Sequence, residues 1–209
     1  MFHRYVLGIP GRNLDSFFLP TEGVRKVLVD AVREEQAGIA VLEGVMGYYD
    51  GLGGTETSAS SWEIAEITDT PVILVLDCKG ASLSAAAMAS GFLHFRKKSH
   101  IAGVIFNRVS LMYYERLVVA VEEASGLPVL GYLPESEEYR MESRHLGLFL
   151  PGEIDRLRER IGRLADQMEK SIAVERVLEV AGMLPLRIEN KEKEKAENAE
   201  RSQVIISVC

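Results

Sequence analysis

Apolar residues follow two alternating patterns along the first two thirds of the chain. Over residues 21–36 they recur at helical spacing with charged residues between them, at Val24, Val27, Leu28 and Ala31. This period predicts an amphipathic helix. The next run, residues 39–42, is short, continuous and rich in β-branched residues. These properties favour a buried strand over a helix.

The same alternation continues as far as residue 133. Further helices are predicted over residues 61–68, 82–95 and 113–125, and further strands over residues 71–76, 101–106 and 128–133. Strands that alternate with helices require right-handed crossovers and a mostly parallel sheet covered on both faces. Residues 1–150 are therefore predicted to form a doubly wound α/β domain.

Three further segments complete the chain. Residues 151–188 contain a helical pattern with mixed charges, which predicts a helical connector. Residues 189–203 are too polar to bury and low in complexity, so we interpret them as a charged linker. Residues 204–209 are predicted to be a strand, and because nothing follows it we expect it to begin a second domain.

The composition of the chain limits the kinds of molecule that it is expected to bind. The 209 residues carry 31 acidic and 24 basic side chains, a formal net charge of -7, so the basic surface of a typical nucleic-acid binder is not expected. Neither cysteine, Cys78 or Cys209, lies in a zinc-binding or disulfide pattern. With no apolar run of about 18 residues and no signal-peptide pattern, we expect a cytoplasmic protein that binds a small molecule or another protein.

The segments that follow the predicted strands are candidate ligand contacts, because ligands of such sheets bind beyond the carboxyl ends of the strands. Glu43 directly follows a strand, and its carboxylate could reach a Mg²⁺ ion that bridges nucleotide phosphates. Gly44 and Gly47 would let the backbone approach a ligand closely. An acidic glycine-rich loop without any ligand is the alternative.

Three other strand ends carry candidate residues. Asp77 could be a second carboxylate near the metal or the cap of the following helix. Asn107 has an amide that can both donate to and accept from an adenine edge, or it could be a structural turn residue. Arg144 could bind a carboxylate or phosphate with two hydrogen bonds. For the neighbouring His145, the sequence alone favours a structural role over a catalytic one.

Six short strings, in order along residues 1–182, resemble the cobyrinic acid a,c-diamide synthase family. They are residues 1–4 (MFHR), 10–15 (PGRNLD), 41–51 (VLEGVMGYYDG), 103–108 (GVIFNR), 131–134 (GYLP) and 143–148 (SRHLGL). The resemblance implies an N-terminal domain of the P-loop NTPase type, related to dethiobiotin synthetase, and a C-terminal glutaminase domain. Residues 204–209 would then begin the glutaminase.

The resemblance also implies a reaction and its participants. ATP, with Mg²⁺, would phosphorylate a carboxylate of the tetrapyrrole cobyrinate, and ammonia derived from glutamine would displace the phosphate to give an amide. Two such steps would amidate the a and c acetates. A homodimer is a candidate assembly. The sister reaction on nickel sirohydrochlorin is the nearest alternative.

Residue roles follow from the matching strings. Glu43 corresponds to a magnesium-associated glutamate and Asp50 to an aspartate involved in carboxylate activation. Asn107 corresponds to the asparagine on the adenine side. The resemblance implies contacts with the substrate for Arg12, Asn13, Asp15 and Arg144.

One expected motif does not occur in the sequence. A family member should contain a GxxxxGK[ST] phosphate loop, and residues 51–54 are glycine-rich but have no following lysine. We therefore expect a fragment of the enzyme that binds ATP poorly and is inactive by itself. A non-catalytic remnant and a partitioning-type ATPase, which would form a nucleotide-dependent dimer, are alternatives from other functional classes.

Overall fold

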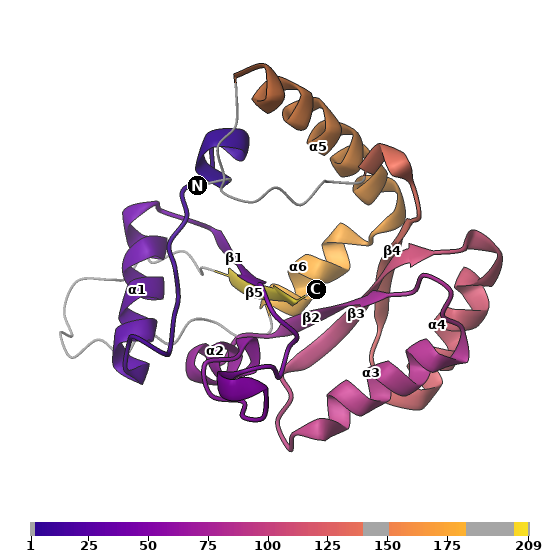
Figure 1. Cartoon of the computed structure of the whole chain (residues 1–209), viewed down its shortest axis with the longest axis horizontal. Coiled ribbons are helices and arrows are strands. Elements are labelled where there is room, and N and C mark those ends of the chain that lie inside the picture. Colours follow the sequence, from indigo (N-terminus) through magenta and orange to yellow (C-terminus); the bar gives the residue numbers. More distant parts are fainter. Residues whose placement is uncertain (1–2, 140–150, 183–202, 209) are drawn as a thin grey trace.

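The computed structural model describes residues 3–139, 151–182 and 203–208. This part of the chain contains a five-stranded sheet of order β1-β5-β2-β3-β4 (Figure 1). All its neighbouring strands are parallel. The strands are β1 (Ile39–Gly44), β2 (Val72–Asp77), β3 (Ile101–Val109), β4 (Val129–Pro134) and β5 (Gln203–Val208).

Helices lie on both faces of this sheet, so the predicted doubly wound, mostly parallel α/β fold is confirmed. The α-helices are α1 (Thr21–Glu34), α2 (Ser61–Thr68), α3 (Leu83–Phe95), α4 (Leu111–Ser125), α5 (Pro151–Ser171) and α6 (Val174–Gly182). Three short helices are η1 (His3–Leu7), η2 (Leu52–Gly54) and η3 (Glu137–Tyr139). None of the helices in the described ranges is long and apolar enough to cross a membrane.

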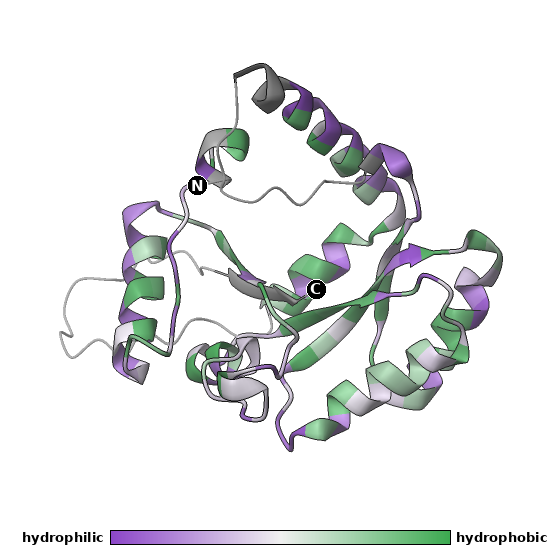
Figure 2. Ribbon diagram, viewed as in Figure 1, coloured by the Kyte–Doolittle hydropathy of each residue, from purple (hydrophilic) through white to green (hydrophobic). Residues whose placement is uncertain are grey.

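The larger core lies between the sheet and helices α2, α3 and α4. Strand residues such as Leu74 and Phe106 pack there against alanines of α3 and against Leu117 and Val121 of α4. On the other face, α6 places Val180 and Ala181 against Ile73 and Leu130. Strands β2 and β3 are predominantly hydrophobic, whereas α1 and the coloured part of α5 alternate between hydrophobic and hydrophilic residues (Figure 2).

β5 lies inside the sheet, although we expected this segment to begin a second domain. Residues 203–208 pair with β1 over its whole length, and residues 206–208 also pair with β2. The predicted strand is therefore present, and it fills the position between two strands that are distant from it in sequence. Its assignment to a separate domain stays a prediction.

β1 is an edge strand, not the fully buried strand that its apolar run predicts. One face packs on α1 through Ala40 and Leu42, which contact Leu28 and Val32 of the helix. On the other face Val41 is 67% exposed, and Ile39 is also exposed. An apolar run indicates a strand, but the number of its covered faces depends on the neighbours that the tertiary structure supplies.

The segment predicted as one helical connector forms two helices. The break is fixed by β4, because Ala173 N donates to Leu130 O at 2.8 Å and Ile172 forms an isolated bridge with Gly131. Gly131 has a φ of +143°, and a Cβ there would collide with the backbone of Ser171 and Ile172. Glycine at this position thus allows α5 and α6 to turn against the sheet.

Candidate functional site at the strand ends

The end of β1 carries the predicted magnesium residue, Glu43, and the loop that follows carries the predicted activation residue, Asp50. Glu43 is exposed near the end of the strand, and the half-buried Gly44 ends it. The loop then turns back, with Asp50 N donating to Gly47 O at 2.9 Å. A Cβ on Gly47 would collide with the Asp50 carboxylate. The bare backbone of Gly47 therefore allows the Asp50 side chain to lie over the turn.

Two tyrosines between Gly47 and Asp50 fix this turn to the body of the domain. Tyr48 is 1% exposed, and its hydroxyl donates to Ser99 O at 2.5 Å. The Tyr49 hydroxyl donates to Phe92 O at 2.7 Å, and its ring stacks on that of Phe92. Burial raises the pKa of Tyr49 to about 12 and raises the pKa of Tyr48 still further. Both hydroxyls therefore remain protonated donors near neutral pH.

The second half of the loop requires glycine at position 51. Gly51 N donates to Glu56 O at 3.0 Å, and a Cβ on Gly51 would collide with the backbone of residues 56–58. We expect Gly51→Ala to lower the free energy of unfolding by about 1–3 kcal/mol, the usual cost of overpacking. Urea titration measures this loss. Gly38→Ala is the matched control because a Cβ there meets open space, and equal losses in both variants would contradict the assignment.

A second group of polar residues lies at the carboxyl ends of β2, β3 and β4. Asp77 and Asn107 are register partners in neighbouring strands, and Asn107 O accepts from Cys78 N at 2.7 Å. Arg108 Nε donates to Asp77 Oδ1 at 2.8 Å, and its Nη2 donates to Oδ2. These hydrogen bonds hold the pKa of Asp77 below its usual range. The role of Asn107 on the adenine side stays a prediction.

Asp77 makes local hydrogen bonds and does not cap the following helix, and its role as a second carboxylate near the metal stays a prediction. Its Oδ1 accepts from Lys79 N at 3.2 Å, which forms a turn after the strand. Ser82, not Asp77, is the residue that precedes α3. Lys79 Nζ in turn contacts Glu135 Oε1, beyond β4, at 2.5 Å. Four charges of alternating sign therefore gather at this edge from three different strand ends.

The two groups are not brought together, because β1 is offset from β2. Glu43 is the register partner of Ser207 in β5, and Ser207 is in turn the register partner of Ile73 in β2. Glu43 therefore lies level with the start of β2. Asp77 lies four residues further, which is about 13 Å along the strand, and two strands away. The strand register therefore separates Glu43 from Asp77.

The N-terminal candidates lie elsewhere. Arg12 pairs with Glu34 at 3.0 Å and with Glu35 at 3.4 Å, at the end of α1 that precedes β1. Asn13 is exposed. Asp15 Oδ1 accepts from Phe17 N at 2.9 Å in a local turn. Their contacts with substrate stay predictions, and Arg144 and His145 lie outside the described residues.

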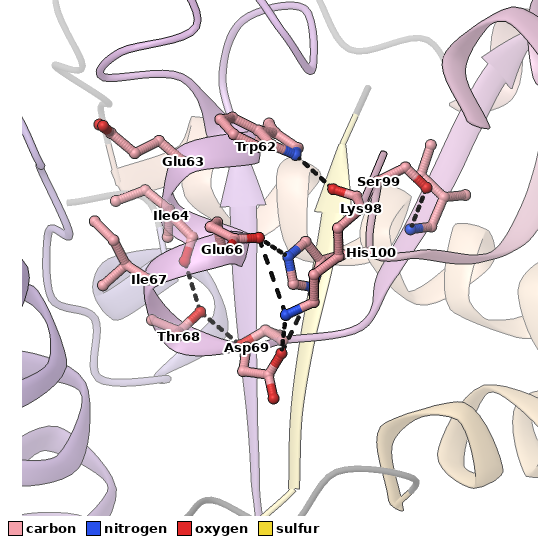
Figure 3. A network of polar contacts seen from close by, with 12 residues as sticks. Trp62, Glu63, Ile64, Glu66, Ile67, Thr68, Asp69, Lys98, Ser99 and His100 are labelled. Carbon is pink, nitrogen blue, oxygen red and sulfur yellow. Dashed lines mark hydrogen bonds and ion pairs between the residues drawn. The ribbon is translucent and has the colours of Figure 1, made fainter. Parts of the chain in front are cut away.

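A polar network at the amino ends of β2 and β3 supports the loop (Figure 3). The side chain of His100 is 3% exposed, and its Nε2 lies 2.6 Å from Glu66 Oε2 of α2. Lys98 Nζ donates to Asp69 Oδ1 at 2.9 Å. Lys98 O also accepts from Trp62 Nε1 at 2.9 Å. The network fastens α2 to the connection before β3, which is the connection that accepts the Tyr48 hydrogen bond.

The sequence patterns predict no individual role for four residues that the structure makes important, Tyr48, Tyr49, Arg108 and His100. Two adjacent tyrosines inside a glycine-rich loop are a recognisable signal for an anchor, because an aromatic ring gains from burial while its hydroxyl needs a partner. The sequence carries no comparable signal for Arg108 or His100. Both depend on partners more than 30 residues away.

Comparison with known proteins identifies the family. A family model described as an AAA domain matches residues 14–143. The chain belongs to this family. The match also agrees with the mostly parallel α/β architecture and with the predicted P-loop NTPase type of fold. No solved structure matches the chain.

Curated relatives confirm the resemblance found in the six strings. The chain is 39% identical to the cobyrinate a,c-diamide synthase of Listeria innocua over 86% of its residues, and 42% identical to that of Thermoplasma acidophilum over 78%. Identity to the Salmonella typhimurium synthase is 39% over 90% of the chain. The chain spans 40%, 36% and 42% of the lengths of these relatives, respectively.

Proposed function

We propose that the chain carries substrate-activating residues of an ATP- and glutamine-dependent amidoligase that acts on cobyrinate. The similarity to synthases of that name over most of the chain carries this proposal. The anchored loop between Glu43 and Asp50 supports it, because this loop presents carboxylates on a fixed backbone. The assignment of residues 204–209 to the start of a glutaminase domain remains part of this proposal.

The reaction divides a difficult substitution into two easier steps. An acetate oxygen of the tetrapyrrole attacks the γ-phosphorus of ATP, and ADP leaves with the electron pair of the broken P–O bond. Ammonia released from glutamine then attacks the acyl carbon of the resulting acyl phosphate. Inorganic phosphate leaves with the C–O electron pair, and the nitrogen loses a proton to give the amide. The a and c acetates would each undergo this sequence.

The loop residues fit a role beside Mg²⁺. No group of three or more His, Cys, Asp or Glu side chains that could hold a metal occurs in the described residues. Mg²⁺ in nucleotide sites needs only one or two protein carboxylates together with phosphate oxygens, and Glu43, with Asp50, would supply them. When bound, the ion would neutralise charge on the phosphates. Tyr48 and Tyr49 would keep the carboxylates at a fixed place.

Glu43→Gln tests the proposal. The test uses a chimera in which this chain replaces the matching segment of the Listeria innocua synthase. Glu43→Gln removes one anionic oxygen with little change of shape, and we expect it to lower kcat for cobyrinate amidation about 100-fold or more. Diamide formation is measured by mass spectrometry with glutamine and Mg-ATP. Glu56→Gln, an exposed glutamate of the same loop, is the matched control and should leave kcat unchanged.

The same assay separates the alternatives. Amidation of nickel sirohydrochlorin but not cobyrinate would replace the substrate and keep the chemistry. A chimera that folds, amidates neither tetrapyrrole and dimerises with nucleotide in light-scattering measurements would favour the partitioning-type switch. Equal turnover by the parent chimera and Glu43→Gln would remove Glu43 from the mechanism.

A further inference from the structure

Arg108 is held in an unfavourable backbone conformation at the carboxyl edge of the sheet. Its φ is +57°, in the left-handed region that residues other than glycine seldom adopt. It lies at an irregularity between β3 and β4, where Asn107 pairs with Leu133 and Val109 with Pro134. Such bulges redirect side chains, often beside functional sites. Here the bulge directs the guanidinium of Arg108 at Asp77.

Folding stability does not account for this arrangement. The Arg108 and Asp77 side chains are 43% and 53% exposed, and exposed ion pairs contribute little to stability. A strained backbone conformation that brings together an exposed pair is therefore a better indication of function than of packing. The nearby Lys79–Glu135 pair is exposed as well.

The four charges interact as one cluster. Besides its hydrogen bonds with Arg108, Asp77 interacts electrostatically with Lys79, and Arg108 interacts with Glu135. Each cation therefore faces carboxylates from two different strand ends. A guanidinium engaged by two hydrogen bonds with a carboxylate has the geometry that also binds a phosphate or a second carboxylate.

We propose that Arg108 and Lys79 form an oxyanion-binding site. In the absence of the anion, Asp77 pairs with Arg108 and Glu135 pairs with Lys79, and the bound anion would replace these carboxylates as the partner of the two cations. The oxyanion is a phosphate group or an organic carboxylate, which share this recognition chemistry. The proposed function, which the similarity to the synthases carries, suggests both sources, a nucleotide and an acidic tetrapyrrole. The anion site itself does not depend on turnover.

The test compares binding with stability in the full chain. Titration calorimetry measures the Kd of two probes. Inorganic pyrophosphate represents the phosphates of a nucleotide, and propane-1,2,3-tricarboxylate represents the carboxylates of an acidic tetrapyrrole. We expect Arg108→Gly to raise the Kd of the bound probe at least tenfold while Tm stays the same or increases, because glycine accepts a positive φ. Arg108→Lys should lie between wild type and Arg108→Gly, since it keeps the charge but loses the two-pronged geometry.

Asp77→Asn should have the opposite effect on affinity. Without the competing carboxylate, we expect the Kd to fall several-fold. A purely structural ion pair predicts a lower Tm for Arg108→Gly and Asp77→Asn with no change in Kd, and that result would overturn the proposal. Lys97→Ala controls for the loss of one surface charge.

The outcomes separate this inference from the proposed function. Arg108-dependent probe binding together with a chimera that amidates nothing would contradict the proposed function alone. Amidation by the chimera, with probe binding by the chain that is absent or independent of Arg108, would contradict the anion site alone. The probe that binds identifies the source of the oxyanion.

Discussion

Deletion of residues 203–209 is expected to unfold the sheet around β1 instead of removing an appendage. β5 pairs with β1 over six residue pairs and with β2 over three, and within the described residues it is the only strand that borders β1. Backbone hydrogen bonds contribute about 1 kcal/mol each. The summed loss is therefore comparable with the roughly 5–15 kcal/mol that stabilises a typical domain. Thermal unfolding followed by circular dichroism should show a lost or strongly shifted transition.

Peptide complementation sharpens this experiment. A peptide of residues 203–208 added to the truncated chain should restore part of the transition, whereas a polar six-residue peptide should not. Hydrogen exchange at residues 39–44 gives a local measure, because β1 amides lose their strand partner when β5 is removed. Unchanged Tm and unchanged protection of β1 after truncation would show that β5 is separable from the sheet, as the predicted second domain requires.

The local elements of the fold were predictable because each depends on neighbouring residues. The helix predicted over residues 61–68 coincides with α2, and the helix predicted over residues 113–125 ends, as α4 does, at Ser125. Strand order was not predictable in the same way. An apolar run does not indicate which strands lie beside it. The sequence therefore predicts neither the position of β5 between β1 and β2 nor the exposure of Val41.

The candidate site, too, was predictable in its local segments but not in the arrangement of those segments in space. The sequence predicted the loop of Glu43 and Asp50 and the ends of the other strands, and the structure places Asp77 beside Asn107. The offset of β1 separates Glu43 from that pair, and such an offset is set by register with β5, about 160 residues later in the chain. The left-handed conformation of Arg108 is likewise a product of the bulge, not of the residue type.

Tyr48→Ala is expected to destabilise the protein by about 3–5 kcal/mol, as for other buried aromatic side chains. Among the residues that the structure describes, Tyr48 is the largest fully buried side chain, and it belongs to the main core cluster. Its replacement would leave a cavity and remove the hydrogen bond that ties the loop to Ser99 O. The Asp50 carboxylate, two residues away, would lose its fixed position over Gly47. Urea titration measures the stability loss, and amidation by the chimera measures the effect on the loop.

Two variants separate the ring from its hydroxyl. Tyr48→Phe keeps the packing and leaves Ser99 O without this donor, so we expect a loss of about 1–2 kcal/mol. Tyr113→Ala removes an aromatic side chain that is 47% exposed, and its effect should stay within about 0.5 kcal/mol. If Tyr48→Ala cost no more than Tyr113→Ala, the ring would not be an anchor. If Tyr48→Phe lowered amidation as much as Tyr48→Ala at temperatures where both are folded, the hydrogen bond to Ser99, more than the packing, would position Asp50.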